Sequence, residues 1–67
     1  MKLTINNLPE TIDVESLSIT ELLAYKHFTF KLIVVKINGQ PLDKKEYSNA
    51  YLKDGDNVQV IHLISGG

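Results

Sequence analysis

Residues 57–67, NVQVIHLISGG, run from an apolar, β-prone segment directly into an end made of Ser65, Gly66 and Gly67. A folded domain gains little from finishing a strand in two glycines, because glycine loses more backbone freedom on ordering than any other residue. We therefore expect these three residues to form a thin, flexible tail that brings the carboxylate of Gly67 to a reacting atom. Residues 64–67 would reach about 13 Å when extended. A frayed chain end is the alternative interpretation.

The strand that precedes this tail is apolar on both faces. Val58 and Val60 share one face, whereas Ile61 and Leu63 place apolar side chains on the other side. The segment 31–37, KLIVVKI, is also apolar on both faces. Because one helix cannot cover both faces of a small sheet, we expect the second face to bind a partner. The predicted partner-binding residues are Leu32, Val34, Ile61, Leu63 and Ile64. Scattered surface hydrophobic residues, which are normal, are the alternative.

A helix is predicted from the segment that begins at Ser18. Ser18 and Glu21 have the spacing of a capping box, and Leu17 and Leu22 occupy the positions of a hydrophobic staple around it. The periodicity predicts a helix of about nine residues that ends near His27. Three residues are expected to form its buried face: Ile19, Leu22 and Leu23.

The remaining segments are predicted to form strands and turns. Residues 1–6 and 10–14 alternate as half-buried strands do, with a break at Asn7-Leu8-Pro9. Asn38-Gly39 is a strong hairpin signal between the strand at 31–37 and a short edge strand at 40–42. Asp54-Gly55-Asp56 is a tight turn. The intervening residues 43–53 are polar and irregular, with room for one helical turn, and have three expected anchors: Tyr47, Tyr51 and Leu52.

This order of elements predicts an α+β fold of the β-grasp type. A hairpin is followed by a helix that crosses one face of a mixed sheet of four to five strands, and the first and last strands are parallel neighbours at its centre. Residues 1–67 form a single domain in this interpretation. The predicted core consists of Ile5, Ile19, Leu22, Leu23, Val58 and Val60.

Composition narrows the possible functions. The 67 residues are 43% apolar with a net charge of −1, so the chain offers one modest core and no basic surface for nucleic acid. There is no cysteine and no apolar run of membrane length, and a cytoplasmic location is the default expectation. His27 and His62 lack a third ligand at metal spacing, so we expect no metal site.

The segment 53–67, KDGDNVQVIHLISGG, resembles the C-terminal part of the ThiS family of small sulfur carriers, and the resemblance covers nearly the whole chain. It includes the capped helix, Val-Lys-Ile-Asn-Gly at 35–39 and the Glu46-Tyr47 region. The chain departs from the family pattern where many members have Pro-Arg and then Trp. Here the corresponding residues are Asp43, Lys44 and Tyr47, and lysine cannot form the bidentate contacts of arginine.

The resemblance implies a carrier without catalytic residues of its own. An E1-like, ThiF-like enzyme would use ATP to adenylate the Gly67 carboxylate, and a sulfur donor such as a cysteine desulfurase would convert it to a thiocarboxylate. The product would pass to a ThiG-like thiazole synthase for thiamin biosynthesis. The carrier itself would bind no cofactor, membrane or nucleic acid, and would be monomeric when free.

Three other functions remain open at this point. The small subunit of molybdopterin synthase is a similar Gly-Gly carrier, but those chains tend to be longer and often have Pro-Pro where this chain has His62-Leu63. A ubiquitin-like interaction module would use Ile61 and Leu63 and leave the tail unreacted. A protein modifier would join Gly67 to a lysine amine.

Overall fold

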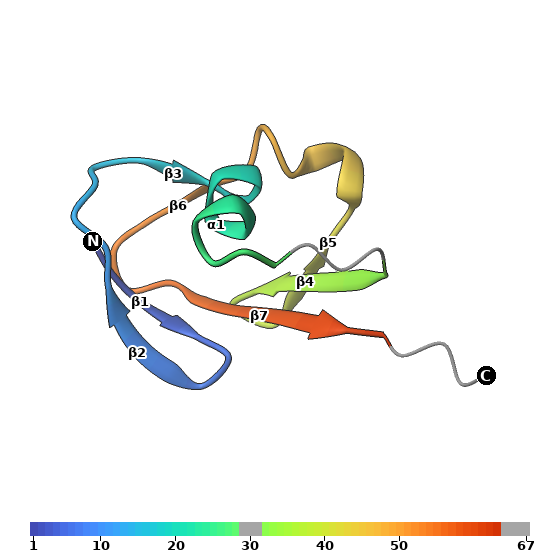
Figure 1. Ribbon diagram of the computed structural model, residues 1–67, viewed down its shortest axis with the longest axis horizontal. Coiled ribbons are helices and arrows are strands. Elements are labelled where there is room, and N and C mark those ends of the chain that lie inside the picture. The colour runs from blue at the N-terminus through green and yellow to red at the C-terminus, as the bar shows by residue number, and fades with distance from the viewer. Residues whose placement is uncertain (29–31, 64–67) are drawn as a thin grey trace.

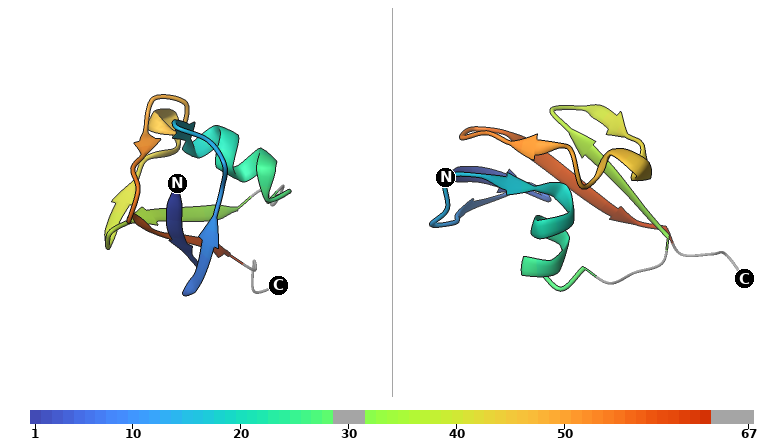
Figure 2. Two further views of the ribbon diagram at one scale, coloured as in Figure 1. Left: turned by 90° about the vertical axis from the view of Figure 1, so that its left-hand side faces the viewer. Right: turned by 90° about the horizontal axis from the view of Figure 1, so that it is seen from above.

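The computed structural model describes residues 1–28 and 32–63. Five strands form a sheet of order β2-β1-β7-β4-β5, and a separate ribbon joins β3 to β6. The strands are β1 (Lys2–Ile5), β2 (Leu8–Thr11), β3 (Leu17–Ser18), β4 (Ile33–Ile37), β5 (Gln40–Leu42), β6 (Tyr51–Leu52) and β7 (Asn57–His62). The helices are α1 (Ile19–Tyr25) and the 3₁₀ helix η1 (Lys44–Glu46). Both helices and the β3–β6 ribbon lie on one side of the sheet, and no described element covers its other side (Figure 1, Figure 2).

The central strand of the sheet is β7. It runs parallel to β1, with Ile5 opposite Val58, and antiparallel to β4, with Val35 opposite Val60. The first and last strands are therefore neighbours, as the sequence predicts. With α1 across one face, this is the β-grasp arrangement, and the predicted α+β fold class is confirmed.

The N-terminal hairpin forms, but its turn lies earlier than expected. Asn6 and Asn7 make the turn with φ angles of 51° and 69°, directly before β2. A two-residue hairpin loop of this kind needs positive φ at both positions, which asparagine tolerates better than most residues. The predicted break at Leu8 and Pro9 was wrong, because both residues belong to β2. The second strand, predicted at 10–14, begins two residues earlier and ends at Thr11. Because β2 is an edge strand, it accommodates the proline.

The capping box of α1 is present as predicted. The Ser18 hydroxyl accepts from the Glu21 N–H at 3.1 Å, and the Glu21 carboxylate accepts from the Ser18 N–H at 2.9 Å. These two hydrogen bonds satisfy donors that the first turn of a helix leaves without partners. The flanking Leu17 and Leu22 are both buried, as the staple requires.

The helix ends two residues before the predicted boundary at His27. The His27 N–H donates to the Ala24 carbonyl at 3.1 Å, and the Phe28 N–H donates to the Leu23 carbonyl at 2.8 Å. With φ of 57° at His27, this is a Schellman motif in which histidine occupies the position that glycine usually takes. The nine-residue helix was therefore an overestimate, because the left-handed residue stops the helix after seven. No helix within residues 1–28 and 32–63 is long and apolar enough to cross a membrane.

The second hairpin joins β4 to β5 through the predicted turn. Asn38 and Gly39 have φ angles of 51° and 83°, which match the asparagine–glycine preference of this turn type. The short edge strand at 40–42 is confirmed. The preceding strand begins at Ile33, so Leu32 lies just outside it.

The segment after this hairpin contains one helical turn and one strand. Tyr47 and Leu52 are buried as predicted, at 8% and 3% exposure. Tyr51 was wrongly predicted to anchor the segment, because its side chain is 59% exposed. The reason is the ribbon: Tyr51 lies opposite Ser18 and Leu52 opposite Leu17, so β6 turns only Leu52 towards the core.

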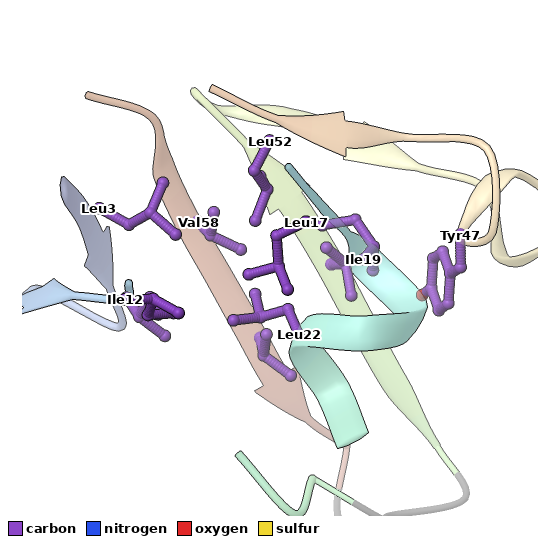
Figure 3. Close-up of a cluster of buried hydrophobic side chains, with 11 residues drawn as sticks. Leu3, Ile12, Leu17, Ile19, Leu22, Tyr47, Leu52 and Val58 are labelled. Carbon is purple, nitrogen blue, oxygen red and sulfur yellow. The ribbon is translucent and has the colours of Figure 1, made fainter. Parts of the chain in front are cut away.

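The core lies between α1 and the sheet (Figure 3). Five of the six predicted core residues are buried, and Leu23 is partly buried against them. The buried apolar residues are Leu3, Ile5, Ile12, Leu17, Ile19, Leu22, Val35, Tyr47, Leu52, Val58 and Val60. Val58 and Val60, the core-facing residues of β7, therefore pack under α1. The opposite face of β7 can contact other molecules.

Candidate functional site

Four of the predicted partner-binding residues lie together at one end of the sheet. We call them the apolar patch: Leu32, Val34, Ile61 and Leu63. Ile61 is 39% exposed, Leu63 47% and Leu32 52%, whereas Val34 is half-buried. Exposed apolar side chains of this size, gathered where the start of β4 meets the end of β7, offer apolar area that a partner can bury.

The pairing of β4 with β7 brings the patch together. Val34 lies opposite Ile61, and the Leu63 N–H donates to the Leu32 carbonyl at 2.8 Å. Because alternate residues of a strand face opposite sides, the burial of Val35 and Val60 under α1 directs Val34 and Ile61 to the uncovered face. The two-sided pattern in the sequence thus corresponds to one covered and one uncovered face within the strands, and the binding of a partner to the uncovered face stays a prediction. Leu32 lies outside β4 and Leu63 lies outside β7, so strand alternation assigns the face of neither.

The rest of the uncovered face carries polar residues and two prolines: Pro41 lies opposite Lys36, and Pro9 lies opposite Thr4. Lys36 lies opposite Gln59, and Thr4 lies opposite Asn57. Within β4 and β7, the apolar side chains of this face are those of Val34 and Ile61, which lie opposite each other towards the end of β7. A partner that covers the patch would also stand next to the chain that follows Leu63.

The remaining predicted site residues are Ile64, Ser65, Gly66 and Gly67, and they lie outside the described residues. The flexible tail and the reactive carboxylate stay predictions. The structure does describe where this segment starts. Leu63 is held by its backbone hydrogen bond to Leu32, so residues 64–67 follow directly from the patch.

Two groups of hydrogen bonds that the sequence did not reveal hold β7 in place. The Asn6 side chain accepts from the Val60 N–H at 2.8 Å. At the start of the strand, Asn38 Oδ1 accepts from the Asn57 N–H at 2.8 Å, and Asn38 Nδ2 donates to Asp56 at 3.0 Å. Each contact joins residues far apart in the chain. The local signal was only the turn preference of asparagine.

The residues that depart from the family pattern lie away from the patch. Tyr47 is buried beside the start of α1, and its carbonyl accepts from the Thr20 N–H at 3.2 Å. Burial raises the pKa of the Tyr47 hydroxyl, and the negative charge of Asp43 raises it further, whereas a hydrogen bond with the Val35 backbone opposes both. Tyr47 is thus a packing residue that ties the 43–50 segment to β4 and α1.

The described residues do not group metal ligands. No cluster of three His, Cys, Asp or Glu side chains that could hold a metal ion occurs within residues 1–28 and 32–63. A hollow of about 240 Å³ lies over β1 and β2, at the opposite end of the sheet from the patch. Its lining is Lys2, Leu3, Thr4, Pro9, Glu10, Thr11 and Gly55.

The five-stranded mixed sheet with α1 across one face is the fold of a ubiquitin-like β-grasp protein. The sequence model of the ThiS family matches residues 3–67. The crystal structure of the thiamine biosynthesis protein ThiS from Geobacter metallireducens superposes with a TM-score of 0.86, 39% identity and complete coverage of both chains. A solution structure of a thiamine biosynthesis protein from the same organism gives a TM-score of 0.77 at 36% identity, covering 100% of this chain and 88% of that one.

A curated relative extends the similarity. The uncharacterized protein ycf40 of Porphyra purpurea is 34% identical over 53 residues, which cover 79% of this chain and 75% of that protein. The family match spans nearly the whole chain, so the resemblance found in the sequence is confirmed. The chain belongs to the ThiS family, the small sulfur carriers of thiamine biosynthesis.

Proposed function

We propose that the protein carries sulfur as a thiocarboxylate on Gly67 and delivers it for thiazole formation in thiamine biosynthesis. The observation that supports this most directly is the position of the apolar patch, which adjoins the start of residues 64–67. A carrier needs such an arrangement, because an enzyme that acts on Gly67 must hold the domain and receive the chain end at the same time.

The proposed chemistry begins with an unreactive group. A free α-carboxyl has a pKa of about 3.3–3.7, so Gly67 would end in a carboxylate at neutral pH. A carboxylate is a poor electrophile because it is negatively charged and has no good leaving group. Attack of one carboxylate oxygen on the α-phosphate of ATP forms an acyl-adenylate and releases pyrophosphate. The terminal persulfide sulfur of a donor such as a cysteine desulfurase then displaces AMP to form an acyl disulfide. A thiol reductant cleaves its S–S bond, which leaves the thiocarboxylate on Gly67 and a disulfide on the donor.

The protein's own contribution is docking and presentation. A ThiF-like adenylating enzyme, and afterwards a ThiG-like thiazole synthase, would bind the apolar patch. Burial of Leu32, Ile61 and Leu63 supplies binding free energy through the hydrophobic effect. ATP would be bound by the activating enzyme, so the carrier is a co-substrate and provides neither a nucleophilic side chain nor a general base.

Two variants separate the reacting end from the docking surface. Deletion of Gly67 leaves the patch intact but places the new carboxylate about 3.5 Å short. Misplacement by about 1 Å can cost on the order of a hundredfold in rate, so adenylation should collapse while affinity for the adenylating enzyme is kept. Leu63→Asp should do the opposite, because it places a charge in the apolar interface. Affinity and ATP–pyrophosphate exchange are measured separately.

Leu8→Asp is the matched control. Leu8 is 64% exposed on the β1–β2 hairpin and does not belong to the patch, so its replacement should change neither affinity nor exchange. A Gly67 deletion that is adenylated at the normal rate would overturn the proposal. Intact-mass analysis of the protein from its host separates the alternatives: an oxygen-to-sulfur exchange supports the carrier, an unchanged mass an interaction module, and a ladder of conjugates a protein modifier.

A further inference from the structure

Strand β7 pairs with β4 over a longer stretch than it pairs with β1. On the β4 side, pairing runs from Val58 to His62 and continues in the hydrogen bond between Leu63 and Leu32. On the β1 side, strand pairing ends where Ile5 lies opposite Val58, because the chain then turns away. The C-terminal half of β7 therefore extends past the end of β1 (Figure 1).

The side chain of Asn6 adds one hydrogen bond to β7 on the side that faces β1. The Asn6 N–H donates to the Val58 carbonyl at 2.9 Å, and the Asn6 Oδ1 accepts from the Val60 N–H at 2.8 Å. The second bond uses the N–H group that a longer β1 would have bound. Since Asn6 has φ of 51°, its backbone leaves the sheet while its side chain occupies the place of the next strand residue. Asparagine suits this position because it tolerates positive φ and also carries an acceptor.

We propose that Asn6 is a positioning residue for the reaction of Gly67, an inference that rests on the proposed function. The Asn6–Val60 hydrogen bond fixes the strand from which residues 64–67 leave, and so links docking on the apolar patch to delivery of the carboxylate. Without this bond, the last residues of β7 gain freedom on the β1 side. The effective concentration of the carboxylate at the adenylating site then falls, although the patch still binds.

The neighbouring asparagine allows a controlled test. Asn6→Gly removes the acceptor and keeps a residue that favours positive φ, whereas Asn6→Asp keeps an acceptor at the same place. Asn7→Gly is the matched control: Asn7 has φ of 69°, is exposed, and forms no side-chain hydrogen bond with any described residue. Thermal melting establishes that every variant is folded at the assay temperature.

The first measurement is amide hydrogen exchange of the free protein. In Asn6→Gly, the Val60 amide should exchange about three- to tenfold faster, the range set by the net free energy of one hydrogen bond. Val58, within the β1–β7 pairing, should exchange at its wild-type rate. Asn6→Asp and Asn7→Gly should leave the Val60 amide protected. Unchanged exchange of Val60 in Asn6→Gly would overturn the inference at its structural step.

The second measurement is adenylation by the ThiF-like enzyme. For Asn6→Gly we expect kcat to fall about three- to tenfold with KM within twofold of wild type, because β4 still holds Ile61 opposite Val34. Asn6→Asp and Asn7→Gly should match wild type in both constants. A wild-type kcat for Asn6→Gly overturns this inference alone. A wild-type chain that is not adenylated at all overturns the proposed function, and the role of Asn6 with it.

Discussion

Asn38 and Asp56 are joined side chain to side chain, with the asparagine Nδ2 donating to the aspartate Oδ1 at 3.0 Å. The same asparagine accepts from the Asn57 N–H at 2.8 Å, and the other Asp56 oxygen accepts from the Lys53 N–H at 2.8 Å. The β4–β5 turn is thereby tied to the turn that starts β7. Both ends of the central strand are thus held by an asparagine from a neighbouring hairpin, Asn38 at its start and Asn6 near its end.

Exchanging the two side chains tests this contact. Asn38→Asp would place a carboxylate against Asp56 and should lower the free energy of unfolding by about 1 kcal/mol, a fall of roughly 4–8 °C in Tm for a domain of this size. The double variant Asn38→Asp, Asp56→Asn restores one amide and one carboxylate, and should recover most of the loss in thermal melts. An additive loss in the double variant would contradict the pairing.

Truncation of Leu22 tests the helix register. Leu22 has 0% exposure in the core under α1, so Leu22→Ala should cost about 2–5 kcal/mol in chemical denaturation. Leu23→Ala is the comparison, because Leu23 lies on the same helix and is only partly buried, and it should cost distinctly less. Equal losses for the two variants would mean that the buried face of α1 is assigned wrongly.

His27 offers a stabilising substitution. Its φ of 57° is strained for any residue with a Cβ atom, whereas glycine adopts it freely. His27→Gly should therefore raise the free energy of unfolding by about 0.5–1 kcal/mol, measured by denaturant titration. Lys26→Gly, one residue earlier at φ of −89°, has no such strain to relieve and should destabilise the protein. Destabilisation by His27→Gly would show that the histidine side chain contributes more than its backbone costs.

The raised pKa of the Tyr47 hydroxyl predicts how the stability of the fold depends on pH in the alkaline range. Burial, reinforced by Asp43, raises the pKa of the Tyr47 hydroxyl, so the folded state keeps this proton to higher pH than the unfolded state does. The associated stability is complete below the unfolded-state pKa near 10, and is lost as pH rises through the folded-state pKa.

Denaturation at several pH values between about 8 and 11 tests this linkage. Tyr47→Phe should reduce the alkaline loss of stability, because the variant has no hydroxyl proton to lose. Tyr51→Phe is the control, since Tyr51 is 59% exposed and should keep the wild-type pH profile. Identical alkaline profiles for wild type and Tyr47→Phe would contradict the linkage.

Features that depend on residues close together in the chain could be predicted from the sequence. The Ser18–Glu21 capping box spans one helical turn, and the Asn38-Gly39 turn joins adjacent strands, so both could be read directly. The alternation of side chains along the strand likewise predicted that Val60 and Ile61 lie on opposite faces, and the structure shows Val60 buried and Ile61 exposed. The position of Val34 and Ile61 on the uncovered face also followed from this alternation, whereas Leu32 and Leu63 lie outside the strands.

Contacts between segments that are far apart in the chain could not be predicted and depend on how the strands pack. Whether Tyr51 or Leu52 is buried depends on the register of β6 against β3, and nothing near these residues in the sequence sets that register. The Asn6–Val60 bond likewise requires β1 and β7 to lie in parallel, 54 positions apart in the chain. Local sequence determines which conformations a segment favours. The register of packed strands determines which groups meet, because a shift of one residue reverses every side chain.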